Sequence, residues 1–495
     1  MRFPRSSGVL LHPTSLPGRF GMGSFGQEAF RFVDRLAEAG QTYWQVLPLG
    51  PTGYGDSPYQ SFSAFAGNPQ LIDLDLLHAE GLLTDADLAD LPAFPAREVD
   101  YGWVIPYKLG KLRLAFDRFE AMAGVEPRDR FEAFRRAQAA WLDDFALFMA
   151  LKDHFSGAGW STWDEDIRAH RPEAVAAWRE RLMPSVRFHS FLQYLFFMQY
   201  QELKRYANEH KVQIIGDIPI FVAYDSADAW SHPEIFYLDT QGHPTVVAGV
   251  PPDYFSETGQ LWGNPLYRWD VLEKSGFAWW IERLKTALSL YDVVRIDHFR
   301  GFEAYWEVPA GEETAINGRW IKAPGHALFQ AVERALGNLN IIAEDLGIIT
   351  PEVEALRDAA GLPGMKILQF AFGGDAENAY LPHNFVRNCV VYTGTHDNDT
   401  TRGWFETATE AERTHALSYL GYEPADVPEA LIRLAFGSVA DLAIVPMQDW
   451  LALSSEARMN TPGKAAGNWA WRMPEGAFEA GLTQHIRTLT ELYGR

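Results

Sequence analysis

Eight short apolar runs, separated by longer segments with helical spacing, recur along the 495 residues of this chain. β-branched and aromatic residues concentrate in the runs, which is typical of buried strands. Buried strands that alternate with helices predict a parallel sheet built from right-handed crossover units. The runs lie at residues 9–13, 43–49, 212–219, 291–301, 339–347, 365–370, 389–399 and 442–449.

Eight strand–helix units predict an α/β fold, a (β/α)8 or TIM barrel that spans residues 1–495. An open doubly wound sheet is the alternative, although the sequence lacks the P-loop that would support nucleotide binding. Ser24 is the expected N-cap of the first helix. Helices are expected at residues 24–40, 277–290, 326–336, 351–359, 409–420 and 427–437.

Two kinds of segment interrupt the regular alternation. Residues 70–186 have long amphipathic stretches and predict a mainly helical insertion between the second and third barrel strands. We interpret residues 249–265 as an irregular loop, and expect it to cover the active-site face together with residues 460–472, because long loops in compact domains are often lids or binding loops.

Ionisable side chains follow the apolar part of several runs. The run Tyr291–Gly301 is apolar at first and then carries Arg295, Asp297, His298 and Arg300. In a barrel the carboxyl ends of all strands converge on one face, which is where barrel enzymes place their active sites. The same position in other runs holds Asp217, Glu344, His396 and Asp397.

Converging carboxylates have three ordinary uses: divalent metal binding, glycoside chemistry and proton abstraction. Metal binding is a serious alternative because His12, His298 and His396 also lie at strand ends. Arg295 is two residues before Asp297 and faces the same side of its strand. A guanidinium there favours ionised Asp297, which suits a nucleophile and competes with a metal. Retaining glycoside enzymes use two such carboxyl groups, one as nucleophile and one as acid/base.

Composition narrows the classes of partner. The formal net charge is −22, which argues against nucleic acid and anionic membranes as partners. No run approaches the length of a membrane span, and the N-terminus has no signal-peptide pattern, so we expect a cytosolic protein. The single cysteine, Cys389, excludes a disulfide within the chain and a multi-cysteine metal site.

Taken together, several strings resemble the 4-α-glucanotransferases, also called amylomaltases or disproportionating enzymes, of the α-amylase superfamily (glycoside hydrolase family 77). They occur in order along nearly the whole chain, which makes the resemblance specific. The strings are Gly8-Val-Leu-Leu-His-Pro-Thr-Ser-Leu-Pro17, Gly55-Asp-Ser-Pro-Tyr59, Gly216-Asp-Ile-Pro219, Arg295-Ile-Asp-His-Phe-Arg-Gly301, Ala343-Glu-Asp-Leu-Gly347, Tyr392-Thr-Gly-Thr-His-Asp-Asn-Asp-Thr400, Pro462-Gly463 and Gly467-Asn-Trp469.

The resemblance implies a role for each matching residue. Asp297 is similar to the family's nucleophile, Glu344 to its general acid/base, and Asp397 to its transition-state-stabilising aspartate. Tyr54 and Tyr101 are candidates for an accessory glucan-binding groove, with packing an equal alternative. The residues implied to bind substrate are Tyr59, Asp217, Gln260, Trp262, Arg295, His298, Asp375, His396 and Asn468.

The implied reaction transfers a segment of an α-1,4-glucan to the 4-hydroxyl of glucose or another glucan, with cyclic products when the chain's own end is the acceptor. The resemblance implies no cofactor and no metal. Three alternatives stay open: an amylase-type α-1,4-glucan hydrolase, a metal-dependent barrel hydrolase, and a glucan-binding protein without activity. The oligomeric state is not predicted.

Overall fold

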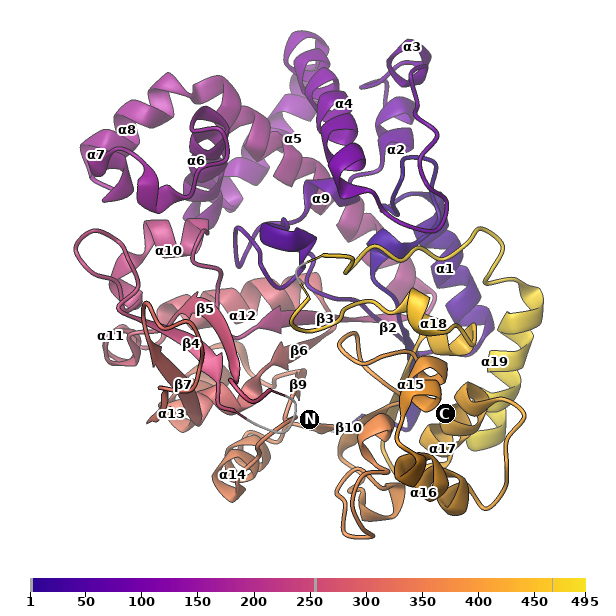
Figure 1. The fold of residues 1–495 in the computed structure, drawn as a ribbon. Helices are drawn as coiled ribbons and strands as arrows, with labels where there is room; N and C mark the ends of the chain where they lie inside the picture. The colour runs from indigo at the N-terminus through magenta and orange to yellow at the C-terminus, as the bar shows by residue number, and fades with distance from the viewer. Residues whose placement is uncertain (1–2, 253–255, 465) are drawn as a thin grey trace.

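Eight parallel strands form one sheet in a computed structural model that describes residues 3–252, 256–464 and 466–495, apart from the side chain of Tyr54. The strand order is β10-β11-β12-β1-β2-β3-β6-β9 (Figure 1). The strands are β1 Ser6–Leu10, β2 Tyr43–Gln45, β3 Gln213–Pro219, β6 Val293–Asp297, β9 Ile341–Ala343, β10 Gly364–Ile367, β11 Cys389–Tyr392 and β12 Leu442–Pro446.

The two end strands of this order, β9 and β10, meet and close the barrel. The Ala343 amide donates to the carbonyl of Pro363 at 3.0 Å. The Asp345 carboxylate accepts a hydrogen bond from the Met365 amide at 2.7 Å. The predicted (β/α)8 barrel is therefore confirmed, and each of the eight apolar runs overlaps one of its strands.

The strand that carries Asp297, β6, extends from the barrel core to the barrel mouth. Successive side chains of a strand point to opposite faces. Val294 and Ile296 pack outward, in the layer between strands and helices, whereas Val293 belongs to the barrel interior. Arg295 follows Val293 on the interior side, and Asp297 follows at the strand end. Thus the same face changes from apolar to ionisable along the strand.

Helices pack around the outside of the sheet (Figure 1). The helix predicted to begin at Ser24 has Gly26 as its N-cap instead, because the Ser24 hydroxyl donates to the carboxylate of Asp73 at 2.6 Å. The outer helices are α1 Gln27–Glu38, α12 Ala278–Leu290, α13 Gly325–Leu336, α14 Pro351–Ala359, α15 Thr401–Thr407, α16 Glu410–Leu420, α17 Val427–Gly437 and α19 Ala480–Tyr493.

Between β2 and β3 the chain consists of helices and short turns, drawn in purple at the top of Figure 1. The longest, α9, is tied to preceding loops because Gln193 hydrogen-bonds both the amide and the carbonyl of Gly67. The insertion boundaries 70–186 stay a prediction. The helices are α2 Leu74–Ala79, α3 Asp85–Leu88, α4 Tyr101–Met122, α5 Val125–Ala137, α6 Ala139–His154, α7 Glu165–Arg168, α8 Pro172–Arg181 and α9 Met183–Glu209.

The interpretation of residues 249–265 as irregular is wrong. Residues 249–250 and 260–265 belong to a second, antiparallel sheet in the order β5-β4-β7-β8. Gly249, Gly259 and Gly263 interrupt the strand pattern, which is why the alternation is weak in the sequence. Residues 253–255 lie outside the described part. The strands are β4 Val246–Val250, β5 Gln260–Pro265, β7 Ala304–Pro309 and β8 Arg319–Lys322.

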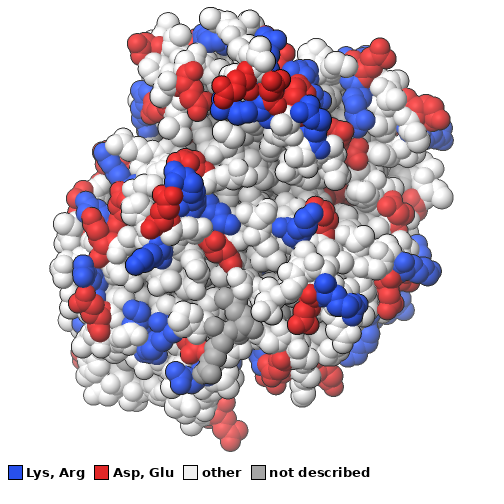
Figure 2. Space-filling model, turned by 180° about the vertical axis from the view of Figure 1, so that it is seen from behind, with Lys and Arg blue, Asp and Glu red and all other residues white. Residues whose placement is uncertain are grey.

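Among the described residues, no helix is long and apolar enough to cross a membrane. On the face seen in Figure 2, basic and acidic side chains are interspersed around a broad uncharged area.

Arg495 joins the C-terminal helix α19 to the barrel. Its guanidinium donates to the carbonyls of Ser6 in β1, Phe436 in α17 and Ala440 before β12, at 3.0–3.1 Å. Arg495→Gln leaves these carbonyls with one short amide, so it should lower the free energy of unfolding by at least about 2 kcal/mol. Urea unfolding measures this. Arg205→Gln, at an exposed ion pair, is the control and should stay within about 0.5 kcal/mol of the parent.

Candidate active site

Arg295 links two carboxylates at the barrel mouth. Its Nη1 donates to Asp217 Oδ2 at 2.6 Å, and its Nη2 donates to Asp297 Oδ1 at 2.9 Å. Asp217 and Arg295 are register partners on the neighbouring strands β3 and β6. Burial acts to lower the pKa of Arg295, but the charges of Asp217 and Asp297 outweigh burial and raise this pKa well above its usual range. The guanidinium therefore stays charged. Asp297 is thus held by a permanent cation while its side chain is 30% exposed.

Tyr59 supports Asp217 from the other side. Its hydroxyl donates to Asp217 Oδ2 at 2.8 Å and lies 3.4 Å from His396 Nδ1. The Tyr59 and His396 rings are stacked, with centroids 4.9 Å apart, and Trp469 tilts against both at 6.0 Å. Burial raises the pKa of Tyr59 well above its usual range, so the hydroxyl keeps its proton and acts as a donor.

Glu344 follows β9 directly and has a different environment from Asp297. Its Oε2 accepts from the His298 amide at 2.6 Å, and its Oε1 accepts from the Leu346 amide at 2.9 Å. Burial first, and then the charge of Asp297, raise the pKa of Glu344 to about 8. A carboxyl group with that pKa is protonated at neutral pH and can donate a proton.

His298 and Trp262 bring the second sheet to the barrel mouth. The indole of Trp262, in β5, stands edge-on to the imidazole of His298 with ring centroids 4.8 Å apart. Gln260 lies beside it and accepts a hydrogen bond from Trp262 Nε1 at 3.2 Å. Burial lowers the pKa of His298 to about 4, so this imidazole is neutral and can donate to or accept from a hydroxyl group.

Asp397 is the most exposed of the three predicted catalytic carboxylates, with half of its side chain, 51%, accessible. Its Oδ1 accepts from Asn460 Nδ2 at 2.6 Å, and its carbonyl accepts from Arg458 Nη2 at 2.6 Å. His396 Nε2 lies 3.5 Å from its Oδ2. Asn460 and Arg458 are not among the predicted site residues, because neither lies at a strand end; the signals for them are the predicted loop 460–472, which Asn460 begins, and the Pro462-Gly463 string.

Asn468 organises the predicted loop 460–472 rather than one of the carboxylates. Its Oδ1 accepts from the Thr461 amide and its Nδ2 donates to the Lys464 carbonyl, both at 2.9 Å. The loop is joined to the site because the Asn460 amide donates to the His396 carbonyl at 3.1 Å.

The remaining predicted residues lie apart from this network. Asp375 is exposed, and its carboxylate accepts from the Glu377 amide in its own turn. Tyr101 begins α4 and donates its hydroxyl to the Trp469 carbonyl at 2.9 Å, which ties it to the loop 460–472. The side chain of Tyr54 lies outside the described part. The accessory groove therefore stays a prediction.

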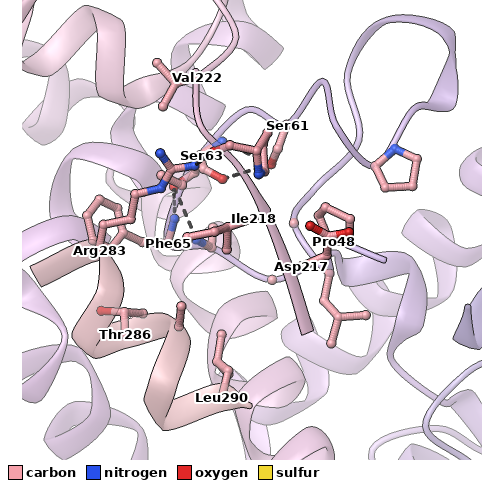
Figure 3. Close-up of a pocket in the computed structure, with 18 of the residues that line it drawn as sticks. Pro48, Ser61, Ser63, Phe65, Asp217, Ile218, Val222, Arg283, Thr286 and Leu290 are labelled. Carbon is pink, nitrogen blue, oxygen red and sulfur yellow. Dashed lines mark hydrogen bonds between the residues drawn. The ribbon is translucent and has the colours of Figure 1, made fainter. Parts of the chain in front are cut away.

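A cavity of about 60 Å³ lies behind Asp217, between β3, α12 and the loop that precedes Gly67 (Figure 3). Apolar side chains line most of it. Two buried polar atoms on its wall, Asp217 Oδ1 and Arg283 Nε, have no partner among the described residues. A cavity of this volume has room for a few water molecules.

Among the described residues, no group of three or more His, Cys, Asp or Glu side chains is arranged to hold a metal ion. In the site itself, the single guanidinium of Arg295 is ion-paired with both Asp217 and Asp297.

An arginine-anchored aspartate and a buried glutamate, on neighbouring strands of a (β/α)8 barrel, define the class of this protein. It is a barrel enzyme of the class that acts on glycosidic bonds, in which paired carboxyl groups are the usual catalytic groups. The comparisons with known proteins name the family. The model of a family described as 4-alpha-glucanotransferase matches residues 11–478.

Curated relatives and a solved structure agree. A 4-alpha-glucanotransferase of Thermus thermophilus is 56% identical and one of Synechocystis is 54% identical, with 99% of this chain covered in each and 99% and 98% of the relatives. An amylomaltase from Streptococcus agalactiae, solved in complex with acarbose, superposes with a TM-score of 0.96 at 42% identity over 99% of both chains. The chain belongs to the 4-alpha-glucanotransferase family and is a transferase of hexosyl groups that acts on α-1,4-glucans.

Proposed function

We propose that this transferase works by a retaining double displacement, with Asp297 as nucleophile and Glu344 as general acid/base. One observation carries the proposal: the two carboxyl groups have opposite environments. The Asp297 carboxylate is ion-paired with the buried guanidinium of Arg295, whereas burial raises the pKa of Glu344 to about 8. Paired carboxyl groups in different environments take different roles in this chemistry.

In the first step, Asp297 bonds to the anomeric carbon of the donor glucan, and the bond to the departing 4-oxygen breaks as Glu344 gives that oxygen its proton. In the second step, the 4-hydroxyl of an acceptor gives its proton to Glu344 and bonds to the same carbon, which releases Asp297. Two inversions give net retention. Asp397 is proposed to stabilise the oxocarbenium-like transition state.

The donor glucan is proposed to contact side chains around the two carboxyl groups. The stacked Tyr59 and His396 rings offer an apolar face beside hydrogen-bonding atoms, which suits a pyranose ring. Arg295 and Asp217 then act mainly by fixing Asp297. The other residues proposed to bind substrate are Gln260, Trp262, His298, Asp375 and Asn468.

Transfer instead of hydrolysis requires that sugar hydroxyls reach the intermediate more readily than water does. Trp262 packs against His298, next to Asp297, and the loop 460–472 supports Asp397 through Asn460. We propose that these two segments exclude water and hold the acceptor. The acceptors are glucose, maltooligosaccharides and, when cyclic glucans form, the free end of the bound chain itself.

The raised pKa of Glu344 predicts the basic limb of the pH profile. The free enzyme needs this carboxyl group protonated to begin the reaction, so kcat/KM for maltotriose should fall as the pH rises through about 8. Initial rates from pH 3 to 10 measure the limb. A fall centred near pH 4.5, the ordinary value for a glutamic acid, would contradict the assignment.

The acceptor proposal is tested with maltotriose and isotopically labelled glucose, with a chelator present. The expected products are a ladder of longer maltooligosaccharides that carry the label in the reducing-end residue. With amylose alone, products that resist exo-acting glucosidases would support cyclisation. Formation of only glucose and maltose, with no labelled oligosaccharide, would contradict the acceptor proposal.

A further inference from the structure

The turn after the nucleophile strand contacts the acid/base segment through three successive residues. The His298 amide donates to Glu344 Oε2 at 2.6 Å, and the Phe299 amide donates to the Glu344 carbonyl at 3.0 Å. Arg300 Nη1 donates to the Ile348 carbonyl at 2.5 Å. His298 has a φ of 54°, in the left-handed region, and the backbone turns there. The first two contacts hold Glu344 itself, whereas the third holds the loop that follows it.

Arg300 is buried and held in one orientation by an aromatic side chain. It is 5% exposed, and its guanidinium carbon lies 3.7 Å from the centroid of the Trp320 ring in β8. Trp306, in β7, braces Trp320 with ring centroids 5.2 Å apart. A planar guanidinium stacked on an indole gains both cation–π attraction and a fixed plane. The antiparallel sheet is thereby connected to the loop after Glu344.

The Ile348 carbonyl lies two residues beyond a group that contacts the acid/base. The Leu346 amide donates to Glu344 Oε1 at 2.9 Å. Ile348 is 47% exposed, so packing of its own side chain holds this part of the loop only weakly. The Leu346 amide is thus held from both sides, by the Asp345 carboxylate, which accepts from the Met365 amide, and by the hydrogen bond from Arg300 to Ile348.

We propose that Arg300 is a positioning residue for Glu344, acting through the 345–348 loop, and that Trp320 keeps Arg300 in place. The inference rests on the proposed role of Glu344 as acid/base. Arg300 takes no part in bond making. Its contribution is the placement of the glutamic acid proton against the departing oxygen, where an error of about 1 Å can cost about 100-fold in rate.

Two donors separate an effect on Glu344 from a general structural effect. With maltotriose, the departing sugar oxygen must receive a proton. With α-maltosyl fluoride, the carbon–fluorine bond breaks, Asp297 bonds to the anomeric carbon, and fluoride leaves as a weakly basic anion that needs no proton. The measurements are kcat for maltotriose and the rate of fluoride release in the first turnover.

Arg300→Met retains the length of the side chain and removes the guanidinium. We expect kcat for maltotriose to fall about 10- to 100-fold and first-turnover fluoride release to fall less than about threefold. Trp320→Ala should show the same selective loss at smaller size, and Trp320→Phe, which retains a ring for Arg300, should largely restore it. The matched control is Arg181→Met, which removes a guanidinium from the Trp178 ring on α8 and should change neither rate.

Equal losses with both donors would overturn the proposal, because they would indicate a general structural role for Arg300. Unchanged maltotriose turnover in Arg300→Met would also overturn it. Glu344→Gln is the reference, and it should lose maltotriose turnover far more than fluoride release. If Glu344→Gln lacks this selectivity, the acid/base assignment itself is wrong. If Glu344→Gln has it and Arg300→Met does not, only the inference about Arg300 fails.

Discussion

Asp297→Asn is expected to lower kcat for transfer between maltotriose molecules by at least about 10⁴-fold, with the fold retained. The amide has nearly the shape of the carboxylate, and its oxygen can still accept the hydrogen bond from Arg295 Nη2. It has no charge, however, and cannot form the bond to the anomeric carbon.

The measurement is the rate of glucose release from maltotriose, together with thermal unfolding to verify the fold. Asp239→Asn is a matched control, since Asp239 is an exposed carboxylate that accepts hydrogen bonds from the Gln241 and His243 amides. It should have the activity of the parent. Retention of more than about one-hundredth of the parent rate in Asp297→Asn would contradict the assignment of the nucleophile.

Glu344→Gln is expected to lower kcat for maltotriose by at least about 10³-fold, because glutamine cannot give a proton to the departing oxygen or take one from the acceptor.

The same substitution should change the pH dependence of stability. The pKa of Glu344 is about 8 in the folded protein and near 4.5 in an unfolded chain, so the unfolded chain loses this proton first. Stability contributed by this group is lost as the pH rises from about 4.5 to 8.

Urea unfolding from pH 5 to 9 measures this second effect. The free energy of unfolding of the parent should fall more steeply over this range than that of Glu344→Gln. The variant should thus be relatively more stable above pH 8. Parallel curves would show that the environment of Glu344 does not raise its pKa, and the separation of roles between the two carboxyl groups would lose its basis.

The barrel and the residues at its mouth could be predicted because both signals are local in the sequence. Asp217, Asp297 and Glu344 each lie in or directly after an apolar run, and a barrel brings such ends together wherever they lie in the chain. The ordered strings around them are specific to the family. Their hydrogen bonds followed from the fold, since Arg295 and Asp217 are partners on adjacent strands.

What could not be predicted depends on contacts between distant segments. Glycines in β4 and β5 of the second sheet weaken the alternating pattern by which strands are recognised. The helices α5 and α6 are separated at Gln138, although the sequence there continues a helical pattern. Asn460 hydrogen-bonds Asp397 although the two residues are far apart in the sequence. Arg300 contacts Trp320 because β7 pairs with β8, and this pairing cannot be predicted from the sequence.

Some glycines are required by close packing of the chain rather than by ligand binding. Gly21, Gly23 and Gly26 have the spacing of a dinucleotide-binding fingerprint. In the structure a β-carbon on Gly23 would lie 2.0 Å from the Pro13 carbonyl oxygen, and one on Gly26 would lie 2.0 Å from Asp73 Oδ2. The close approach of the chain to itself accounts for both glycines.

Covalent trapping tests the central claim, that Asp297 forms a bond to the glucan while Glu344 supplies the proton. A fluorinated maltosyl fluoride slows breakdown of the intermediate, and proteolysis followed by mass spectrometry then locates the attached sugar. The account predicts one fluorinated maltosyl group per chain, on the peptide that contains Asp297, with no label in Asp297→Asn. A label on Asp397 or Glu344, or full activity without any labelled peptide, would contradict it.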